Sequence, residues 1–428
     1  MEESKNKVQH LNDVEYVKFA KEAFDRKLFP DDFDNRTLRE QCTWITENSV
    51  KVFPNIPQSL VNLLPASYHE INYDRSLLEK PIWLDMNKYR RGHKFVNDHY
   101  GSVAIAMLLG IMQVYSFDYA LKPMIVSKRS DTPYLGFKRY LSTVRRILSW
   151  FNGEPWIKGT AAYNDMQYAR KMHYFMRKQL RELTHEEIDN LSNIAEPWCP
   201  DRELLLKDFA AACPFQKIEY RPYIVMSKSS HKPKGINNAD SAVVQCSFAS
   251  MVLLFSQYLG IHDATDEDLE AFAHMWRCYG YCLGIEDEYN FCRGSLDEIK
   301  QRTRDVYEKW IIYNLKDISP EWEHMTRCLV ESVNYYPLVY APYKVVVLLS
   351  TDILNLNMSN LYASLSFAEW IAYKSWTFLL RHGLKVSFIR YIFNKIMHNV
   401  LNAAANFSSE KLAKIQEQSN KQLKKTKA

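Results

Sequence analysis

Three polar residues, Arg139, Thr143 and His173, lie on two consecutive segments with helical patterns. Arg139 and Thr143 are four residues apart in Phe-Lys-Arg-Tyr-Leu-Ser-Thr, so a helix would stack them on one face. His173 follows after enough chain for one helix to end and another to bring an imidazole back opposite the first. A cation, a hydroxyl and an imidazole that face one cavity could hold a haem. They could equally be ordinary polar residues of a large helical fold.

The order of these residues resembles the catalytic domain of the latex-clearing-protein, or rubber oxygenase, family. A related member is the oxygenase of fungal mycophenolic acid biosynthesis, which is bound to the endoplasmic reticulum. Members carry Arg-x3-Thr and, further on, the His that ligates haem b. Two flanking segments are also similar: residues 89–95 (Tyr-Arg-Arg-Gly-His-Lys-Phe) running into 100–110, and residues 275–288 with Trp-x3-Gly-Tyr-x-x-Gly.

The resemblance implies roles for four residues. His173 would be the axial ligand of the haem iron, as a neutral imidazole. Arg139 and Thr143 would lie at the distal side or the haem edge, as catalytic and cofactor-binding groups. Arg170, close to His173 on the same helix, would pair with a haem propionate. The alternatives are a core or surface histidine, a salt-bridged surface arginine and a helix threonine.

Two positions depart from the rubber-cleaving members. The residue before the threonine is a lysine there, where it can cap the iron, and it is Ser142 here. The distal acid of those members, proposed as a base, falls here near Pro123. A haem site can therefore persist while the cleavage chemistry differs or is lost.

Composition predicts a mostly helical protein with a sizeable core. Apolar residues make up 47% of the 428, and only 12 are glycine. Long segments with 3.6-residue periodicity have few breaks. Helical patterns occur near 137–152, 160–182, 240–260, 264–284, 295–315, 320–333, 342–356 and 360–400. We expect one large all-α, multi-helix domain, and the resemblance adds globin-like helical packing around haem b.

Three regions are expected along the chain. Residues 1–60 are polar with short amphipathic pieces and are interpreted as an N-terminal arm. Residues 61–407 would form the rubber-oxygenase-like catalytic domain, including a loop-rich connection at about 190–239. Residues 408–428 are polar and lysine-rich, which favours a disordered basic tail.

Two segments bear on membrane contact. Residues 100–117 carry no charge and reach the minimum length of a membrane span. Ser102, Gln113 and Ser116 within them favour a buried core helix. Residues 384–400 form a basic, aromatic amphipathic pattern, which is typical of an interfacial membrane helix or of a final helix packed on the core.

Charge and cysteine content limit the setting of the protein. The net charge of +5 is spread over mixed signs, which does not indicate a nucleic-acid partner. The first residues lack the apolar core of a signal peptide. Eight scattered cysteines are typical of reduced thiols in the cytosol. We expect a cytoplasmic protein, with peripheral contact at the cytosolic face of the endoplasmic reticulum compatible with an apolar substrate.

The resemblance implies a haem-b-dependent oxygenase that uses dioxygen on an apolar isoprenoid or lipid substrate, with oxidative double-bond cleavage as one outcome. The protein would supply the axial ligand and a dry cavity, while the iron carries the oxygen chemistry. A non-catalytic helical protein that binds haem or lipid is the alternative, favoured by the missing distal groups. A scaffold without a cofactor is the third hypothesis.

Overall fold

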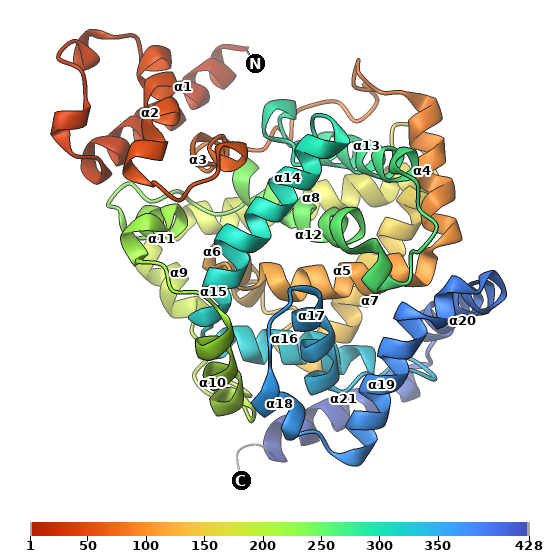
Figure 1. Cartoon of the computed structure of the whole chain (residues 1–428). Helices are drawn as coiled ribbons and strands as arrows, with labels where there is room; N and C mark the ends of the chain where they lie inside the picture. Colours follow the sequence, from red (N-terminus) through yellow and green to blue (C-terminus); the bar gives the residue numbers. More distant parts are fainter. Residues whose placement is uncertain (1, 426–428) are drawn as a thin grey trace.

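The structure is a computed structural model that describes the backbone of residues 2–425 and the side chains of residues 11–424. It is helical throughout that range, without a β-strand, and forms a single helical domain (Figure 1). One isolated antiparallel bridge joins Glu70 to Asn237. The expected all-α class is confirmed.

The longer helices are α1 (Glu2–Ala23), α2 (Leu38–Val52), α4 (Met86–Asp98), α5 (Tyr100–Val114), α6 (Asp118–Val126), α7 (Pro133–Phe151), α8 (Ala161–Glu182), α9 (His185–Ser192), α10 (Arg202–Ala212), α11 (Pro222–Lys228), α12 (Asn238–Phe255), α13 (Asp266–Cys282), α14 (Leu296–Val306), α16 (Pro320–Val333), α17 (Tyr343–Ile353), α19 (Phe367–Arg381), α20 (Ser387–Ala405) and α21 (Ser409–Lys425). The shorter elements named below are α3 (Leu63–Ala66), η5 (Ser256–Leu259) and η8 (Gly383–Lys385). The expected connection at about 190–239 contains α10 and α11, so it is less loop-rich than the prolines suggested.

Many of the helices begin at residues whose side chains can cap a helix. A capping box satisfies two free main-chain N–H groups at a helix start, because the cap side chain and the third helical residue bond each other's backbone. Such boxes open six helices, at Thr37, Thr184, Asn237, Thr265, Ser295 and Ser366.

Helix α5 lies at the centre of the fold and is mostly buried. It crosses α12 closely at Gly110, where an added Cβ would overlap the carbonyl oxygen of Ser247. The indole of Trp322 on α16 donates to the Met112 carbonyl at 3.2 Å. Neighbouring helices therefore cover α5 on several sides, as expected for a core helix.

Among the residues that the structure describes, one helical stretch, from Asn238 to Leu259, is long and apolar enough to cross a membrane, and 61% of its apolar window is buried inside the protein. Helices α4 and α5 would pass the same test as a pair, but they meet at a bend of 92°. Core helices of water-soluble proteins share this length and composition, so these two features say little about location.

The N-terminal region folds as a helical pair at the upper left of Figure 1. The Tyr16 hydroxyl on α1 lies 3.3 Å from Thr46 on α2. Asp13 on α1 contacts His69 Nε2 at 2.8 Å, which fixes the pair to the rest of the chain.

The expectation of a disordered tail after Ser408 is wrong for residues 409–425, which form α21. Ile415 and Ser419 are buried in this helix. Ser419 Oγ accepts a hydrogen bond from the Tyr134 N–H at 3.1 Å, and Tyr335 donates to Gln422 at 2.8 Å. Lysines on the outer face dominate the composition, but the inner face still packs on α7. Residues 426–428 lie outside the described range.

Replacing Gly110 with alanine tests the α5–α12 crossing. The added methyl group has no room against the Ser247 carbonyl, so we expect a loss of about 1–3 kcal/mol in the free energy of unfolding. Urea denaturation followed by circular dichroism would measure it. Gly235→Ala is the control, because the nearest atom to its added methyl lies 3.4 Å away. An equal effect of both substitutions would contradict the packing described here.

Candidate functional site

The site predicted from the sequence is built on α7 and α8. The Thr132 side chain caps α7 and Pro133 occupies its first turn. The Thr160 side chain caps α8 by accepting from the Tyr163 N–H. Gly159, with φ of +88°, turns the short connection between the two helices.

The two helices run antiparallel, and their register brings Arg139 opposite His173. Arg146 on α7 lies 3.7 Å from Asp165 on α8, and its guanidinium stacks 4.0 Å from the ring centre of Tyr168. Arg139 precedes Arg146 by two turns, and His173 follows Asp165 by about the same length of helix. The positive charge of Arg139 also acts on the His173 imidazole and contributes to lowering its pKa.

His173 has an unusual position on its helix. The buried side of α8 is formed by Ala162, Met166, Arg170, Arg177 and Leu180. At 100° per residue, His173 falls within that buried stripe. Its side chain is nevertheless exposed.

The surroundings of His173 affect its imidazole although the side chain is exposed. Desolvation by the surrounding protein, with a smaller contribution from Arg139, lowers the pKa of the imidazole to about 4. Exposure alone would indicate a surface residue, and desolvation alone a core residue. The His173 imidazole is thus solvent-exposed, while the protein around it disfavours its charged form.

Arg170 and Arg177 hold α8 in place on either side of His173. Arg170 Nη2 donates to the carbonyls of Tyr73 and Arg75, both at 2.6 Å. Arg177 donates to the Ile236 carbonyl and lies 3.0 Å from the Glu70 carboxylate. Burial lowers the pKa of both guanidinium groups. These buried cations are therefore satisfied by main-chain oxygens and one acid, and they fix the orientation of the helix face that carries His173.

Arg139 is half-buried and makes contacts of another kind. Its guanidinium donates to Ser127 Oγ at 2.8 Å and to Ser130 Oγ at 3.4 Å, and it contacts Met124 Sδ at 2.8 Å. No carboxylate pairs with it among residues 11–424. Arg139 is thus a positioned cation without a neutralising acid, rather than the salt-bridged surface residue of the alternative interpretation.

Thr143 and Ser142 lie on the same helix. Thr143 is half-buried one turn after Arg139. The Ser142 hydroxyl accepts from the guanidinium of Arg146. Ser142 is thereby engaged within α7.

A buried carboxyl that the sequence analysis missed lies near Pro123. A Cβ placed on Gly235 would lie 3.6 Å from Pro123 Cγ and 3.8 Å from Asp240 Oδ2, so Pro123 and the Asp240 carboxyl both flank this glycine. Burial raises the pKa of Asp240 to about 7, although the Ile236 N–H donates to it at 2.6 Å. In the sequence, Asp240 shows only as the third residue of a helix-capping box, and nothing local indicates its burial.

Three tyrosine hydroxyls near Asp240 are buried: Tyr73, Tyr119 and Tyr223. The rings of Tyr119 and Tyr223 lie 4.9 Å apart, and all three tyrosines are close enough to interact electrostatically with Asp240.

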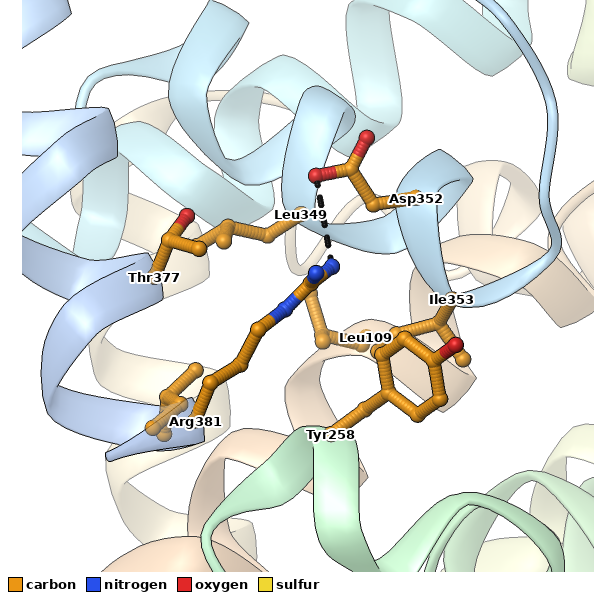
Figure 2. A pocket seen from close by; sticks show the side chains of 8 residues that line it. Leu109, Tyr258, Leu349, Asp352, Ile353, Thr377 and Arg381 are labelled. Atoms are coloured by element: carbon orange, nitrogen blue, oxygen red, sulfur yellow. Dashed lines mark ion pairs between the residues drawn. The ribbon is translucent and has the colours of Figure 1, made fainter.

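Two small cavities lie elsewhere in the fold. Figure 2 shows one of them, between α17, α19 and η5, where Arg381 and Asp352 point toward each other at 3.9 Å beside the ring of Tyr258. The other lies between α5 and α7. Each has a volume of about 10 Å³, which suits one water molecule at most. Neither can hold a substrate.

The described residues contain no group of three His, Cys, Asp or Glu side chains that could hold a metal ion. A haem does not need such a group, because the porphyrin supplies four nitrogens and one histidine suffices as the protein ligand.

Comparison with known proteins does not identify a family for this chain. No protein-family model matches the chain, and neither a curated protein nor a solved structure matches it. The resemblance to the rubber oxygenases therefore depends on the motif residues.

Removing the imidazole of His173 should change how stability depends on pH. A histidine whose pKa falls from 6.5 to about 4 on folding stabilises the protein above pH 6.5 and loses that contribution as the pH falls toward 4. When the pH falls from 7.5 to 5, we expect the free energy of unfolding to decrease less in His173→Gln than in wild type. Urea denaturation at each pH would measure it. His382→Gln, at an exposed helix end, is the control. Parallel pH profiles for wild type and His173→Gln would rule out a desolvated imidazole.

Proposed function

We propose that the protein is a haem-b-dependent oxygenase of the rubber-oxygenase-like kind, acting with dioxygen on an apolar isoprenoid or lipid substrate. In this proposal the helices pack around the haem in a globin-like arrangement. One observation carries it: an accessible imidazole, His173, stands in the middle of a buried helix face opposite the unneutralised cation Arg139.

The chemistry of the donor set fits a haem. An iron ligand must be a neutral imidazole with a free nitrogen, and the lowered pKa keeps His173 neutral at physiological pH. Within residues 11–424, neither of its ring nitrogens forms a hydrogen bond. A haem held there would supply a redox-active iron that binds dioxygen.

The flanking residues would orient the site and shape its charge. Arg139 would place a fixed positive charge opposite the imidazole, which would favour negative charge within the site. Thr143, one turn along α7, would supply a hydroxyl donor and acceptor. Arg170 is expected to act mainly by holding α8, because its Nη2 is engaged with main-chain carbonyls, although the propionate role remains part of the proposal.

Asp240 is the proposed proton-transfer group of the site. The acid of the rubber-cleaving members would fall near Pro123, and Pro123 and the Asp240 carboxyl both flank Gly235. Its pKa of about 7 lets it both accept and release a proton near neutral pH. This carboxyl offers a substitute for the missing acid that the sequence did not reveal.

The second candidate function is a non-catalytic haem- or lipid-binding protein. It is favoured by Ser142, which stands where the rubber-cleaving members have an iron-capping lysine and whose hydroxyl is engaged by Arg146. This alternative predicts haem uptake without oxygen consumption.

Expression with added haem and a visible spectrum tests the cofactor. We expect a strong Soret band in wild type that is lost or shifted in His173→Ala. His382→Ala is the matched control and should keep the wild-type spectrum. A colourless wild type that is folded by circular dichroism would overturn both haem hypotheses and leave a scaffold or a lipid-binding protein.

Oxygen uptake separates the two haem hypotheses. With squalene as the apolar isoprenoid, the haem-loaded wild type should consume oxygen, and Asp240→Asn should slow this by about 10²-fold or more while keeping the Soret band. Asp189→Asn, on the exposed helix α9, is the control. Haem binding with no oxygen uptake on squalene or shorter and longer polyprenyl chains would favour the non-catalytic protein.

A further inference from the structure

The hairpin formed by α19, η8 and α20 lies at the periphery of the molecule (Figure 1). Its helices carry apolar side chains on both their inner and outer faces. A helix that is apolar on all sides is normally covered on all sides. The outer face of this hairpin is not covered by the part of the chain that the structure describes.

The inner face is fully engaged with the protein. Phe393 packs against Gly101 so closely that an added Cβ on Gly101 would overlap its ring. Asn394 Oδ1 accepts from the Gly101 N–H at 2.9 Å, and its Nδ2 donates to the Asp98 carbonyl at 2.9 Å. Leu380 and Leu384 complete a small core with Phe393. The hairpin is therefore held rigidly on the corner between α4 and α5.

The outer face presents large apolar side chains to solvent. On α20, Phe388, Ile392 and Ile396 follow one another at four-residue spacing, with Phe388 69% exposed. On α19, Phe367 and Phe378 are 77% and 65% exposed. The other exposed apolar side chains of the hairpin are Trp370, Ile371, Val386, Ile389 and Tyr391. Scattered exposed apolar residues are normal, but a continuous set on one face marks an interaction surface.

The charged residues of the hairpin are mostly basic. Residues 367–405 contain five Lys or Arg and one acid, Glu369, which is engaged in the capping box of Ser366. Lys374, Lys385 and Lys395 are exposed, and none of them forms an ion pair with another described residue. Lys374 and Lys395 lie on the outward apolar stripes of α19 and α20. Lysines in such places can bury their methylene chains while the ammonium groups reach a polar, anionic layer.

We propose that this face docks on the surface of an anionic phospholipid bilayer, with α19 and α20 lying in the interface plane. The aromatic and aliphatic side chains would enter the boundary between headgroups and acyl chains, and the three lysines would contact lipid phosphates. A second copy of the chain fits less well, because two such faces would bring their lysines together. This proposal is independent of the haem and would hold for an enzyme or a binding protein.

Vesicle flotation with the full chain tests the proposal. We expect wild type to float with vesicles of 70% phosphatidylcholine and 30% phosphatidylserine, and to float less in 0.5 M salt. The triple variant Phe388→Ser, Ile392→Ser, Ile396→Ser should bind at least about tenfold less. Ile82→Ser with Phe215→Ser removes two exposed apolar side chains elsewhere and should bind as wild type does.

A second variant, with the lysines replaced, tests the proposal even if the serine variant does not fold. Lys374→Gln, Lys385→Gln, Lys395→Gln keeps the apolar face and should lose most of the preference for phosphatidylserine over pure phosphatidylcholine. Circular dichroism and size-exclusion chromatography with light scattering accompany each variant. Wild type that stays unbound on both kinds of vesicle would overturn the proposal. So would a wild-type dimer that the serine variant converts to a monomer, because a second copy would then cover this face.

Discussion

Helix α5 imposes the constraint on which the rest of the fold depends. It carries no charged side chain, so burial of its whole surface is favourable and every side needs a neighbouring helix. Gly110 lets α12 approach one side, and the Trp322 indole brings α16 to another. Gln113 donates to Ser350 Oγ on α17 at 2.9 Å. The other helices are then placed by how they pack around this centre.

The same constraint positions the candidate site and the outer hairpin. Helix α7 packs against α5 on one side, and α8 packs on α7, with Arg170 and Arg177 fixing its rotation through main-chain carbonyls. That rotation places His173 on the side of α8 that carries Arg170 and Arg177. Helix α20 reaches α5 through Gly101 and also packs on α7, and its second apolar face remains outside. If both proposals hold, one central helix links a haem pocket to a membrane-facing surface.

Sequence patterns predicted much of the fold and part of the site. The helices of the central region were expected close to their observed bounds, because capping residues and 3.6-residue periodicity are local signals. The expectation that residues 100–117 form a core helix agrees with the burial of α5. The prediction of a disordered tail was wrong because the lysine-rich composition does not reveal that one face of the helix, around Ile415, is buried. Asp240 was missed because its burial depends on helices that are distant in the sequence.

The sequence by itself determined the helical class, the helix starts and the four-residue spacing of Arg139 and Thr143, since each depends on residues within one or two turns. The tertiary structure alone decided that His173 occupies the buried side of α8 while staying accessible, and that Asp240 is buried. It also decided which face of α20 remains uncovered. These outcomes depend on how helices far apart in the chain pack together, and no local pattern of side chains encodes that geometry.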